Sequence, residues 1–390
     1  MRKEYELLLR CLPEPPDFRY DWESLRKTPL APLFDAMADT PQNPVWHGEG
    51  DVWTHTKLVC EALTAMPAFR ALPERQRRAL ALAALLHDAG KPRRTRLEDG
   101  VFVSPGHSSA GAQLVRRTLW QDFGLCGDPT ARGMREAVCM LIRYHGLPLH
   151  LLDRKDPELR ARREAEGGRL APDFSLRLLC MLSEADVLGR IADDRDELLE
   201  TVRMSAELAE EAGCLDGPYR FPSAHTARAY LSGRKVWPEQ ELYDDSWGEV
   251  ILLCGLPGTG KDTWLQGTHP ELPVISLDAI RAELGVKPTE EQGRVIQLAR
   301  ERAREYLRRH EPFAWNATSL TADTRKRQID LFEQYHAAVR IVYLETEWDE
   351  NLRRNAGRSA AVPEHVVNDM LGRLAPPERA EARFVEWICV

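Results

Sequence analysis

The sequence predicts a multidomain protein in which an all-α helical bundle is followed by an α/β domain with a parallel sheet. The chain has 390 residues, more than a single hydrophobic core usually organises. Up to about residue 232, apolar residues recur at the three-and-four spacing of amphipathic helices. After residue 247, short apolar runs alternate with helical stretches, which is typical of parallel strands with helices on both faces of the sheet.

The first domain is expected over residues 1–235, with an N-terminal extension at 1–45 to which no role is assigned. The helical spacing marks residues 53–66, 74–89, 107–123, 134–145, 173–191 and 197–212. Residues 236–247 are polar and contain Pro, so they are the predicted linker.

The second domain is expected over residues 248–390. Its predicted strands are the short runs 250–254, 272–276, 312–316, 338–344 and 384–390. The first of them, Val250-Ile-Leu-Leu-Cys254, is continuously apolar, as in strands that are buried on both faces.

Composition restricts the class of protein. No apolar run approaches the roughly 20 residues that cross a bilayer, and the start Met1-Arg-Lys-Glu-Tyr-Glu does not resemble a signal peptide, so a cytoplasmic location with no membrane partner is expected. The eight cysteines include no CxxC pair, which favours buried reduced thiols. The net charge of −8 argues against nonspecific coating of nucleic acid but permits a local basic pocket.

The most specific motif is Gly255-Leu-Pro-Gly-Thr-Gly-Lys261-Asp-Thr263, which lies between a predicted strand and a predicted helix. Glycines let backbone N–H groups surround a polyphosphate, the helix N-terminus adds positive dipole, and a lysine reaches the outer phosphates. The motif therefore predicts binding of ATP or another NTP with Mg²⁺, and the expected binding residues are Gly255, Gly258, Thr259, Gly260, Lys261, Asp262 and Thr263. Because Asp262 replaces the usual Ser or Thr, the magnesium ligand is left open.

A second set of polar residues lies at helix ends in the first domain. His87-Asp88 follows an apolar helix, His55 and His107 open two others, His145 closes a fourth, and Asp186 lies within a fifth. Residues from several helices can meet in a bundle core as metal ligands. Imidazole and carboxylate together suit Mn, Fe, Co, Ni or Zn better than Mg, and such an ion generates hydroxide and neutralises phosphate charge.

Singly, each of these histidines is more often a structural residue than a ligand. In their order along residues 50–190, they resemble the HD superfamily of metal-dependent phosphohydrolases. The resemblance implies that His55, His87, Asp88 and Asp186 hold a first metal, that His107 and His145 support a second, and that Lys91 contacts phosphate. His47 and His150 lie outside the pattern and are interpreted as structural or surface residues.

Two further motifs narrow the chemistry of the second domain. Asp278 and Arg281 follow a predicted strand end, where α/β sheets place substrate; a carboxylate there can accept a hydroxyl proton and an arginine can grip phosphate. Arg354 and Arg358 lie four residues apart on one helix face and could close over phosphate. The ordinary alternatives are a capped helix start with an i+3 pair and a solvated charged helix.

In this order, residues 248–390 resemble the P-loop polynucleotide 5′-kinases. The resemblance implies that Asp278 is the general base, that Arg281 contacts the substrate phosphate, and that Arg354 and Arg358 form a lid. It gives weaker roles to the segment Trp315-Asn-Ala-Thr318 and to Arg325, a candidate phosphate contact. Asn316 stands where related small-molecule kinases often carry Asp.

An HD domain ahead of such a kinase is similar to the bacterial HD-Pnk family of RNA end-healing enzymes, and the similarity covers nearly the whole chain. It implies NTP-dependent phosphorylation of 5′-OH ends and metal-dependent hydrolysis of 2′,3′-cyclic phosphate or 2′-phosphate ends. The partners implied are RNA ends, with DNA ends not excluded, and an RNA ligase acting downstream.

Two other functions remain open on the sequence. An enzyme of nucleotide metabolism would join an HD nucleotide hydrolase to a kinase for nucleosides or other small molecules, and its pocket would reject oligonucleotides. A noncatalytic regulator would bind nucleotide without transferring phosphate, so that Asp278→Ala would leave its function intact.

Overall fold

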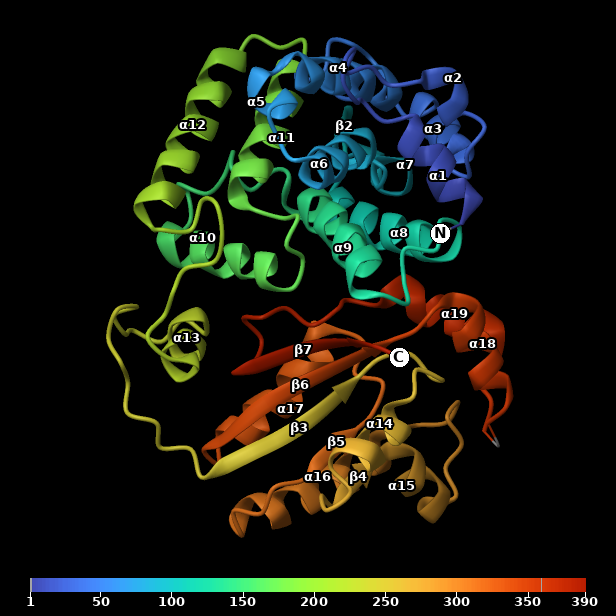
Figure 1. Cartoon of the computed structure of the whole chain (residues 1–390), viewed down its shortest axis with the longest axis vertical. Coiled ribbons are helices and arrows are strands. Elements are labelled where there is room, and N and C mark those ends of the chain that lie inside the picture. Colours follow the sequence, from blue (N-terminus) through green and yellow to red (C-terminus); the bar gives the residue numbers. More distant parts are fainter. Residues whose placement is uncertain (1, 359) are drawn as a thin grey trace. The chain divides into compact units, whose positions relative to one another are not determined.

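The computed structural model describes residues 2–358 and 360–390. The chain forms two compact units, one ending at Tyr219 and the other beginning at Arg220 (Figure 1). The expected fold class is confirmed, because the first unit is a helical bundle and the second contains a parallel sheet. No helix in the described ranges is both long and apolar enough to cross a membrane, and no disulfide joins the cysteines, all of which lie in those ranges.

The six predicted helical segments correspond to six helices of the first unit, with ends displaced by up to five residues, and the other helices of this unit were not predicted individually. In chain order, the described helices of this unit are α1 (Lys3–Arg10), α2 (Trp22–Leu25), α3 (Ala31–Ala38), α4 (Val52–Ala65), α5 (Pro67–Arg70), α6 (Glu74–Leu86), α7 (Lys91–Arg94), α8 (His107–Gln121), α9 (Pro129–Tyr144), α10 (Pro157–Ala165), α11 (Leu176–Leu188) and α12 (Arg195–Glu211), with a 3₁₀ turn at Glu166–Arg169. A small hairpin, β1 (Arg96–Glu98) with β2 (Val101–Val103), was not predicted. Each strand has three residues, and only β2, Val101–Val103, is apolar throughout, so the run is too short to predict a strand.

Helix α6 lies at the centre of this bundle, packed against α4, α9 and α11. All residues from Ala79 to Leu86 are fully buried, so this part of the helix has no solvent-facing side. His87 and Asp88 follow at its buried C-terminal end. The apolar run therefore places two polar residues in the interior, where they need partners.

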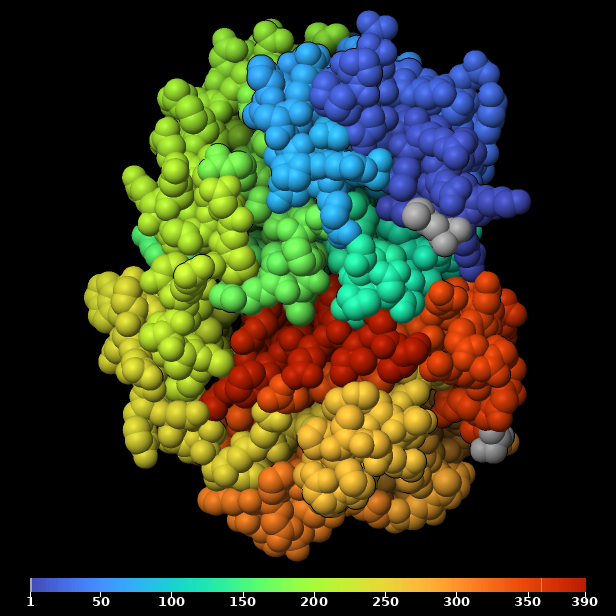
Figure 2. All heavy atoms as spheres, viewed as in Figure 1, coloured from blue at the N-terminus to red at the C-terminus, as the bar shows by residue number. Residues whose placement is uncertain are grey.

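The N-terminal extension forms a layer on one side of the first unit, dark blue in Figure 2. The ring of Phe34 in α3 stacks on Trp53 of α4 with centroids 4.5 Å apart, and Glu14 pairs with Arg78 of α6 at 2.8 Å. The extension therefore contributes to the core of this unit.

The second unit contains five parallel strands in the order β4-β5-β3-β6-β7. All five predicted strands are confirmed. The elements are α13 (Ala224–Leu231), β3 (Gly248–Cys254), α14 (Lys261–Thr268), β4 (Val274–Ser276), α15 (Leu277–Leu284), α16 (Gly293–Arg308), β5 (Ala314–Asn316), α17 (Ala322–Glu333), β6 (Ala337–Glu345), α18 (Trp348–Ala356), α19 (Glu364–Arg373) and β7 (Phe384–Cys389).

Helices cover both faces of this sheet, as expected. Ile251 and Leu253 of β3 pack with Leu265 of α14 on one face. Cys254 points to the opposite face, because side chains alternate along a strand, and its thiol lies 3.8 Å from Arg325 of α17. The loop between β3 and α14 is thereby anchored at the carboxyl end of a central, fully covered strand.

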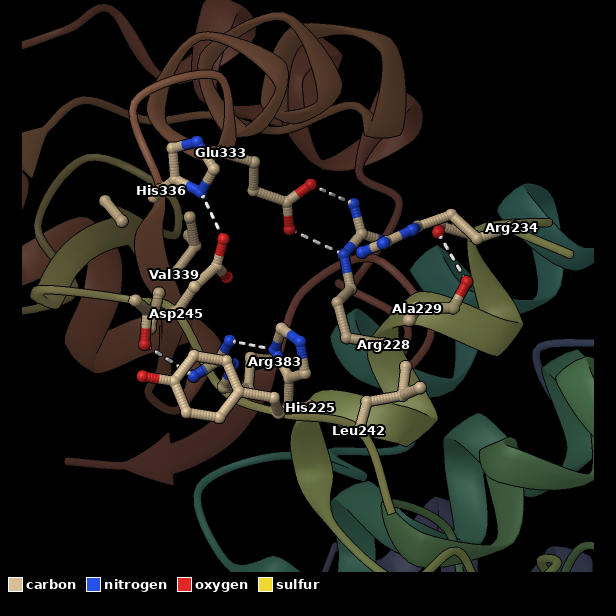
Figure 3. Close-up of a pocket in the computed structure, with 15 residues that line it drawn as sticks. His225, Arg228, Ala229, Arg234, Leu242, Asp245, Glu333, His336, Val339 and Arg383 are labelled. Atoms are coloured by element: carbon tan, nitrogen blue, oxygen red, sulfur yellow. Dashed lines mark hydrogen bonds and ion pairs between the residues drawn. The ribbon is translucent and has the colours of Figure 1, made fainter. Parts of the chain in front are cut away.

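The boundary between the units differs from the predicted one at residue 235, because α13 belongs to the second unit. Arg228 of α13 donates to both carboxylate oxygens of Glu333 at 2.6 and 2.8 Å and to the carbonyl of Ala380 at 2.9 Å. Figure 3 shows this paired fork. The residues in these contacts are 105 or more positions apart in the sequence, so local periodicity does not predict the contacts.

The same part of the second unit contains a pocket of about 490 Å³, drawn in Figure 3. It adjoins Ala337 at the start of β6, at the opposite end of the strands from the glycine loop. Two of its lining side chains have ionic partners, since Arg383 contacts Asp244 at 2.8 Å and His336 contacts Asp245 at 2.7 Å. We therefore interpret this pocket as the joint that fixes residues 220–247 to the sheet.

Candidate active sites

The first unit brings together all six predicted metal ligands. His55 lies in the first turn of α4, His87 and Asp88 follow α6, His107 begins α8, His145 follows α9, and Asp186 lies in the last turn of α11. The contacts that link them are His55 Nε2 to Asp186 Oδ1 at 3.0 Å, His87 Nε2 to Asp88 Oδ2 at 3.3 Å, His107 Nε2 to Asp88 Oδ1 at 3.4 Å, and His107 Nε2 to His145 Nε2 at 3.4 Å.

The backbone sets the tautomer of three of these rings. The Nδ1 atoms of His87, His107 and His145 lie 2.9, 2.8 and 2.7 Å from the carbonyl oxygen three residues earlier in the chain. A carbonyl can only accept, so each Nδ1 donates its hydrogen and each Nε2 keeps a lone pair. The three Nε2 atoms that face the cluster are therefore in the form that binds a metal.

Two atoms of the cluster show that these residues suit an ion. His87 Nε2 and Asp88 Oδ1 are buried, and neither forms a hydrogen bond with any group in the described part of the chain. Leaving buried polar atoms without partners is costly, and a divalent ion would satisfy both. Imidazole nitrogen and carboxylate oxygen fit a transition metal, which agrees with the expected donor set.

The electrostatics favour the ligand forms of these groups. Burial raises the pKa of Asp88, but Lys91 and the neighbouring imidazoles outweigh it and hold that pKa well below its usual range. Burial also raises the pKa of Asp186, but Arg190 and the neighbouring imidazoles outweigh it and hold that pKa well below its usual range. Burial, reinforced by His87 and His107, lowers the pKa of His145 to about 4. At neutral pH the cluster therefore presents charged carboxylates beside a neutral His145.

Sequence reasoning missed Glu49, which supports the cluster from behind. Its Oε1 lies 2.8 Å from the Nδ1 atoms of both His47 and His55, and its Oε2 accepts from the backbone N–H of Ile191 at 3.0 Å. A carboxylate behind a ligand histidine orients the ring and raises its basicity. His47 is thus a structural residue beside the site, whereas the His150 side chain is 66% exposed. In the sequence, the only feature that could have indicated the role of Glu49 is that His47 and Glu49 lie a few residues before His55.

A cleft of about 790 Å³ opens onto the cluster. Asp88, His107, His145 and Asp186 line it. Cationic side chains also line it, namely Lys91, Arg96, Arg143, Arg154, Arg160 and Arg190. Lys91 donates to Asp88 Oδ2 at 2.7 Å, so its ammonium group lies beside the cluster. Such a lining suits an anionic substrate.

The glycine loop of the second unit requires its glycines. Gly255 and Gly258 have φ angles of 143° and 86°, which side chains disfavour. A Cβ on Gly255 would lie 2.5 Å from the carbonyl oxygen of Leu344, and one on Gly258 would lie 2.8 Å from that of Asn351. Lys261 lies across the loop, where Nζ donates to the carbonyls of Gly255 at 3.0 Å and Leu256 at 2.7 Å. Burial lowers the pKa of this amine to about 8.

Asp262 and Asn316 meet beside this loop. Asn316 Nδ2, at the end of β5, donates to Asp262 Oδ1 at 2.5 Å. In many P-loop enzymes the loop supplies a hydroxyl and a strand supplies a carboxylate to Mg²⁺. Here the carboxylate lies on the loop side and the amide on the strand. The Asp262 carboxylate is of the oxygen-donor type that Mg²⁺ prefers, so it stays a candidate ligand beside the loop.

The structure brings Asp278, Arg281 and Arg358 together. Asp278 Oδ1 accepts from Arg281 Nη1 at 2.5 Å, and its Oδ2 accepts from Arg358 Nη2 at 3.2 Å. The ordinary alternative holds in part, because Ser276 caps α15 by accepting from the backbone N–H of Ala279. A capped helix does not explain the contact with Arg358, which lies 80 residues away in the sequence.

Arg354 lies beside the glycine loop. Its Nη1 is 3.6 Å from the position that a Cβ on Gly260 would occupy, and its Nε donates to Glu350 at 2.6 Å. The two predicted lid arginines therefore face different groups, Arg354 the loop and Arg358 the carboxylate of Asp278. Helix α18 ends at Ala356 and Arg358 lies beyond it, so the expectation that the two arginines share one helix face is wrong.

The expectation that Arg325 contacts phosphate is wrong. Its side chain is fully buried and donates to both oxygens of Glu381 at 2.7 Å. It also donates to the carbonyls of Ser319 at 3.0 Å and Ala375 at 2.8 Å. The guanidinium thus holds α17 to the loops that follow β5 and α19, and no part of it is exposed to a substrate.

Replacing Arg325 with alanine should therefore lower the free energy of unfolding by about 3–5 kcal/mol, because the change removes a fully buried guanidinium with all its hydrogen bonds and leaves the largely buried carboxylate of Glu381 without its cation. Urea denaturation followed by circular dichroism measures this change. Lys326→Ala is the matched control, since that side chain is 71% exposed on the same helix and should change stability by less than about 1 kcal/mol. If Arg325→Ala kept the stability of the wild type but had a raised KM for the substrate, a role of Arg325 in contacting phosphate would be supported instead.

Comparison with known proteins gives each unit a family match. A family model for the HD domain matches residues 51–188, and one for an AAA domain matches residues 250–377. The chain is 38% identical over 116 residues to the multifunctional CCA protein of Halorhodospira halophila, a match that covers 30% of this chain and 24% of that protein. It is 27% identical over 172 residues to the bifunctional uridylyltransferase/uridylyl-removing enzyme of Streptomyces coelicolor, a match that covers 43% of this chain and 18% of that protein.

The chain thus spans less than a quarter of the length of each of these relatives. The matches show that it joins an HD domain, of the metal-dependent hydrolase type, to a P-loop domain of the kinase-like type. These two matches support an enzyme with hydrolase and kinase-type activity.

Proposed function

We propose that this chain, which joins an HD domain to a P-loop kinase-like domain, heals RNA ends. In this proposal the second unit phosphorylates 5′-OH ends with an NTP, and the first unit hydrolyses 2′,3′-cyclic phosphate or 2′-phosphate ends. The observation that carries the proposal is the carboxylate of Asp278 between Arg281 and Arg358. This group can accept a hydroxyl proton beside a phosphate-binding loop, while the same chain holds a hydrolase cluster.

In the kinase reaction, each residue has a defined task. The backbone N–H groups of the glycine loop bind the donor phosphates, and Lys261 turns from its loop carbonyls toward them. Asp278 accepts the proton of the 5′-hydroxyl, which increases its nucleophilicity. Arg281 and Arg358 hold that carboxylate and bind phosphate next to it, and Arg354 stabilises charge that develops during transfer. Mg²⁺ bound with the NTP neutralises phosphate charge.

In the hydrolase reaction, the His/Asp cluster positions the substrate and its water. His55, His87, Asp88 and Asp186, with His107 and His145, would hold a divalent ion, which would supply Lewis-acid activation of water and phosphate. Glu49 keeps the ring of His55 oriented. Lys91, at 2.7 Å from Asp88, offers a cation to a phosphate oxygen on the cleft side of the cluster. The remaining cations of the cleft attract the anionic end of a strand.

Two further points support nucleic-acid ends as the substrate. The two units carry opposite chemistry toward phosphate, since one adds it and the other removes it, which is what a break with a 5′-OH and a cyclic phosphate requires. A relative of part of the chain is named for removing a uridylyl group, which is a nucleotide held by a phosphate ester.

An end-group assay tests the proposal. The full chain is incubated with ATP, Mg²⁺, Mn²⁺ or Ni²⁺, and a short RNA that carries a 5′-OH and a 2′,3′-cyclic phosphate. We expect both ends to be converted. A separate reaction with a DNA oligonucleotide that carries a 5′-OH shows whether the kinase prefers ribose or deoxyribose. If RNA stays unchanged while free nucleosides and nucleotides are converted, the protein is an enzyme of nucleotide metabolism and the proposal is wrong.

A further inference from the structure

An exposed tryptophan lies at the cleft of the first unit. Trp46 lines the cleft together with His47, and its side chain is 50% exposed. Its neighbour Val45 and the nearby Ile191 are exposed as well. Large apolar side chains that gather at the surface usually mark a binding site, and neither reaction described above uses Trp46.

The loop that carries Trp46 is braced by hydrogen bonds. Asn43 accepts from the backbone N–H of Val45 through its side chain at 3.0 Å, and from the backbone N–H of Trp46 through its carbonyl at 3.1 Å. The backbone N–H of Gln42 donates to the carbonyl of Gly50 at 3.0 Å, which closes the base of the loop. The indole is therefore presented on an ordered support, which reduces the entropy lost when a ligand binds.

The surroundings of Trp46 define the chemistry of its ligand. The same cleft is lined by the cations around Lys91 and by the His/Asp cluster, so it combines an aromatic face with positive charge and a phosphate-hydrolysing centre. Aromatic side chains beside cationic grooves bind single strands by stacking on bases while the cations bind the backbone. An apolar protein partner would be less well matched to this many charges.

We propose that Trp46 stacks on a nucleobase of the strand whose terminal phosphate lies at the His/Asp cluster. The ligand class is a single-stranded oligonucleotide end, and Trp46 selects it over phosphate esters that lack a base. This inference rests on the proposed hydrolase function and deepens it. Because every base has a π-face, the contact provides affinity without sequence preference.

The test compares Trp46→Ala with wild type on two substrates. One is a short RNA ending in a 2′,3′-cyclic phosphate, and the other is methyl riboside 2′,3′-cyclic phosphate, which has no base. We expect Trp46→Ala to raise KM for the RNA by about 5- to 150-fold, the range that corresponds to loss of one stacked base. We expect its kcat for the RNA and its KM for the base-free ester to change by less than about twofold.

Two further variants sharpen the result. Trp46→Phe should recover most of the RNA affinity, because a smaller ring still stacks. Trp237→Ala is the matched control, since Trp237 is 76% exposed in the second unit, and it should leave both KM values unchanged. If Trp46→Ala raised KM equally for the RNA and for the base-free ester, Trp46 would have a structural role. If both KM values stayed unchanged and the oligomeric state changed, Trp46 would belong to a protein interface. Either result overturns the inference.

A binding measurement separates this inference from the proposed function. If wild type hydrolyses neither substrate, the proposed hydrolase function fails. Fluorescence anisotropy with a short RNA that already carries a 5′-phosphate then tests stacking by itself. A Kd that is weaker in Trp46→Ala by the same factor supports the contact, and equal Kd values overturn it.

Discussion

Replacing Asp278 with asparagine should lower kinase turnover by about 10²–10⁴-fold, the usual contribution of a general base, and leave phosphate removal unchanged. Asparagine keeps the shape of the side chain but cannot accept the hydroxyl proton. Because Arg281 and Arg358 both bind this carboxylate, the variant also loses the charge that holds them. Transfer of labelled phosphate from ATP to a 5′-OH oligonucleotide measures the effect.

The control for this variant is Asp330→Asn. Asp330 pairs with Lys326 at 2.6 Å on an exposed helix face, so it reproduces a carboxylate–cation pair on a helix without the neighbouring loop. It should retain full kinase activity. Lys261→Ala should match Asp278→Asn in abolishing transfer, because it removes a group that acts on the transferred phosphate. Full kinase activity of Asp278→Asn would support the regulator and remove Asp278 from the mechanism.

Replacing Asp88 with asparagine should lower phosphate removal by more than about 100-fold, since even residues behind the ligands typically contribute 10–100-fold. The change removes a negative charge that Lys91 and two imidazoles contact. It also leaves the Lys91 ammonium without its carboxylate. The bound metal, measured by elemental analysis of the purified protein, should decrease in parallel with hydrolysis of the cyclic phosphate.

Kinase activity serves as the internal control for folding of the Asp88 variant, because Asp278 and Lys261 belong to the other unit. His87→Ala should behave as Asp88→Asn does. The matched control is His365→Ala, which removes an exposed histidine on α19 of the other unit, outside the cleft lining. Loss of both activities in a folded Asp88→Asn protein would show that the two sites do not act independently.

Much of the fold and of both candidate sites follows from the sequence because the responsible forces act locally. The apolar run of β3 is short and ends at a glycine-rich turn, whereas that of α6 is longer, and this difference in length and flanking residues selects a strand for one and a helix for the other. The glycines at 255 and 258 are required by the backbone of a turn. The six candidate metal ligands were selected by their order along the chain, which resembles that of the HD superfamily, because each of them by itself has an ordinary structural explanation.

The tertiary structure alone decided which distant groups meet. Arg325 and Arg358 are both arginines that the sequence places in helical segments, yet Arg325 is buried in α17 beside Glu381, whereas Arg358 lies beyond the end of α18 and contacts Asp278. Glu49 became part of the hydrolase site, and α13 joined the second unit, through contacts that span many residues. Periodicity reports which face of an element is apolar. The partner of a charged side chain depends instead on distances between elements, because electrostatic and hydrogen-bond energies fall steeply with separation.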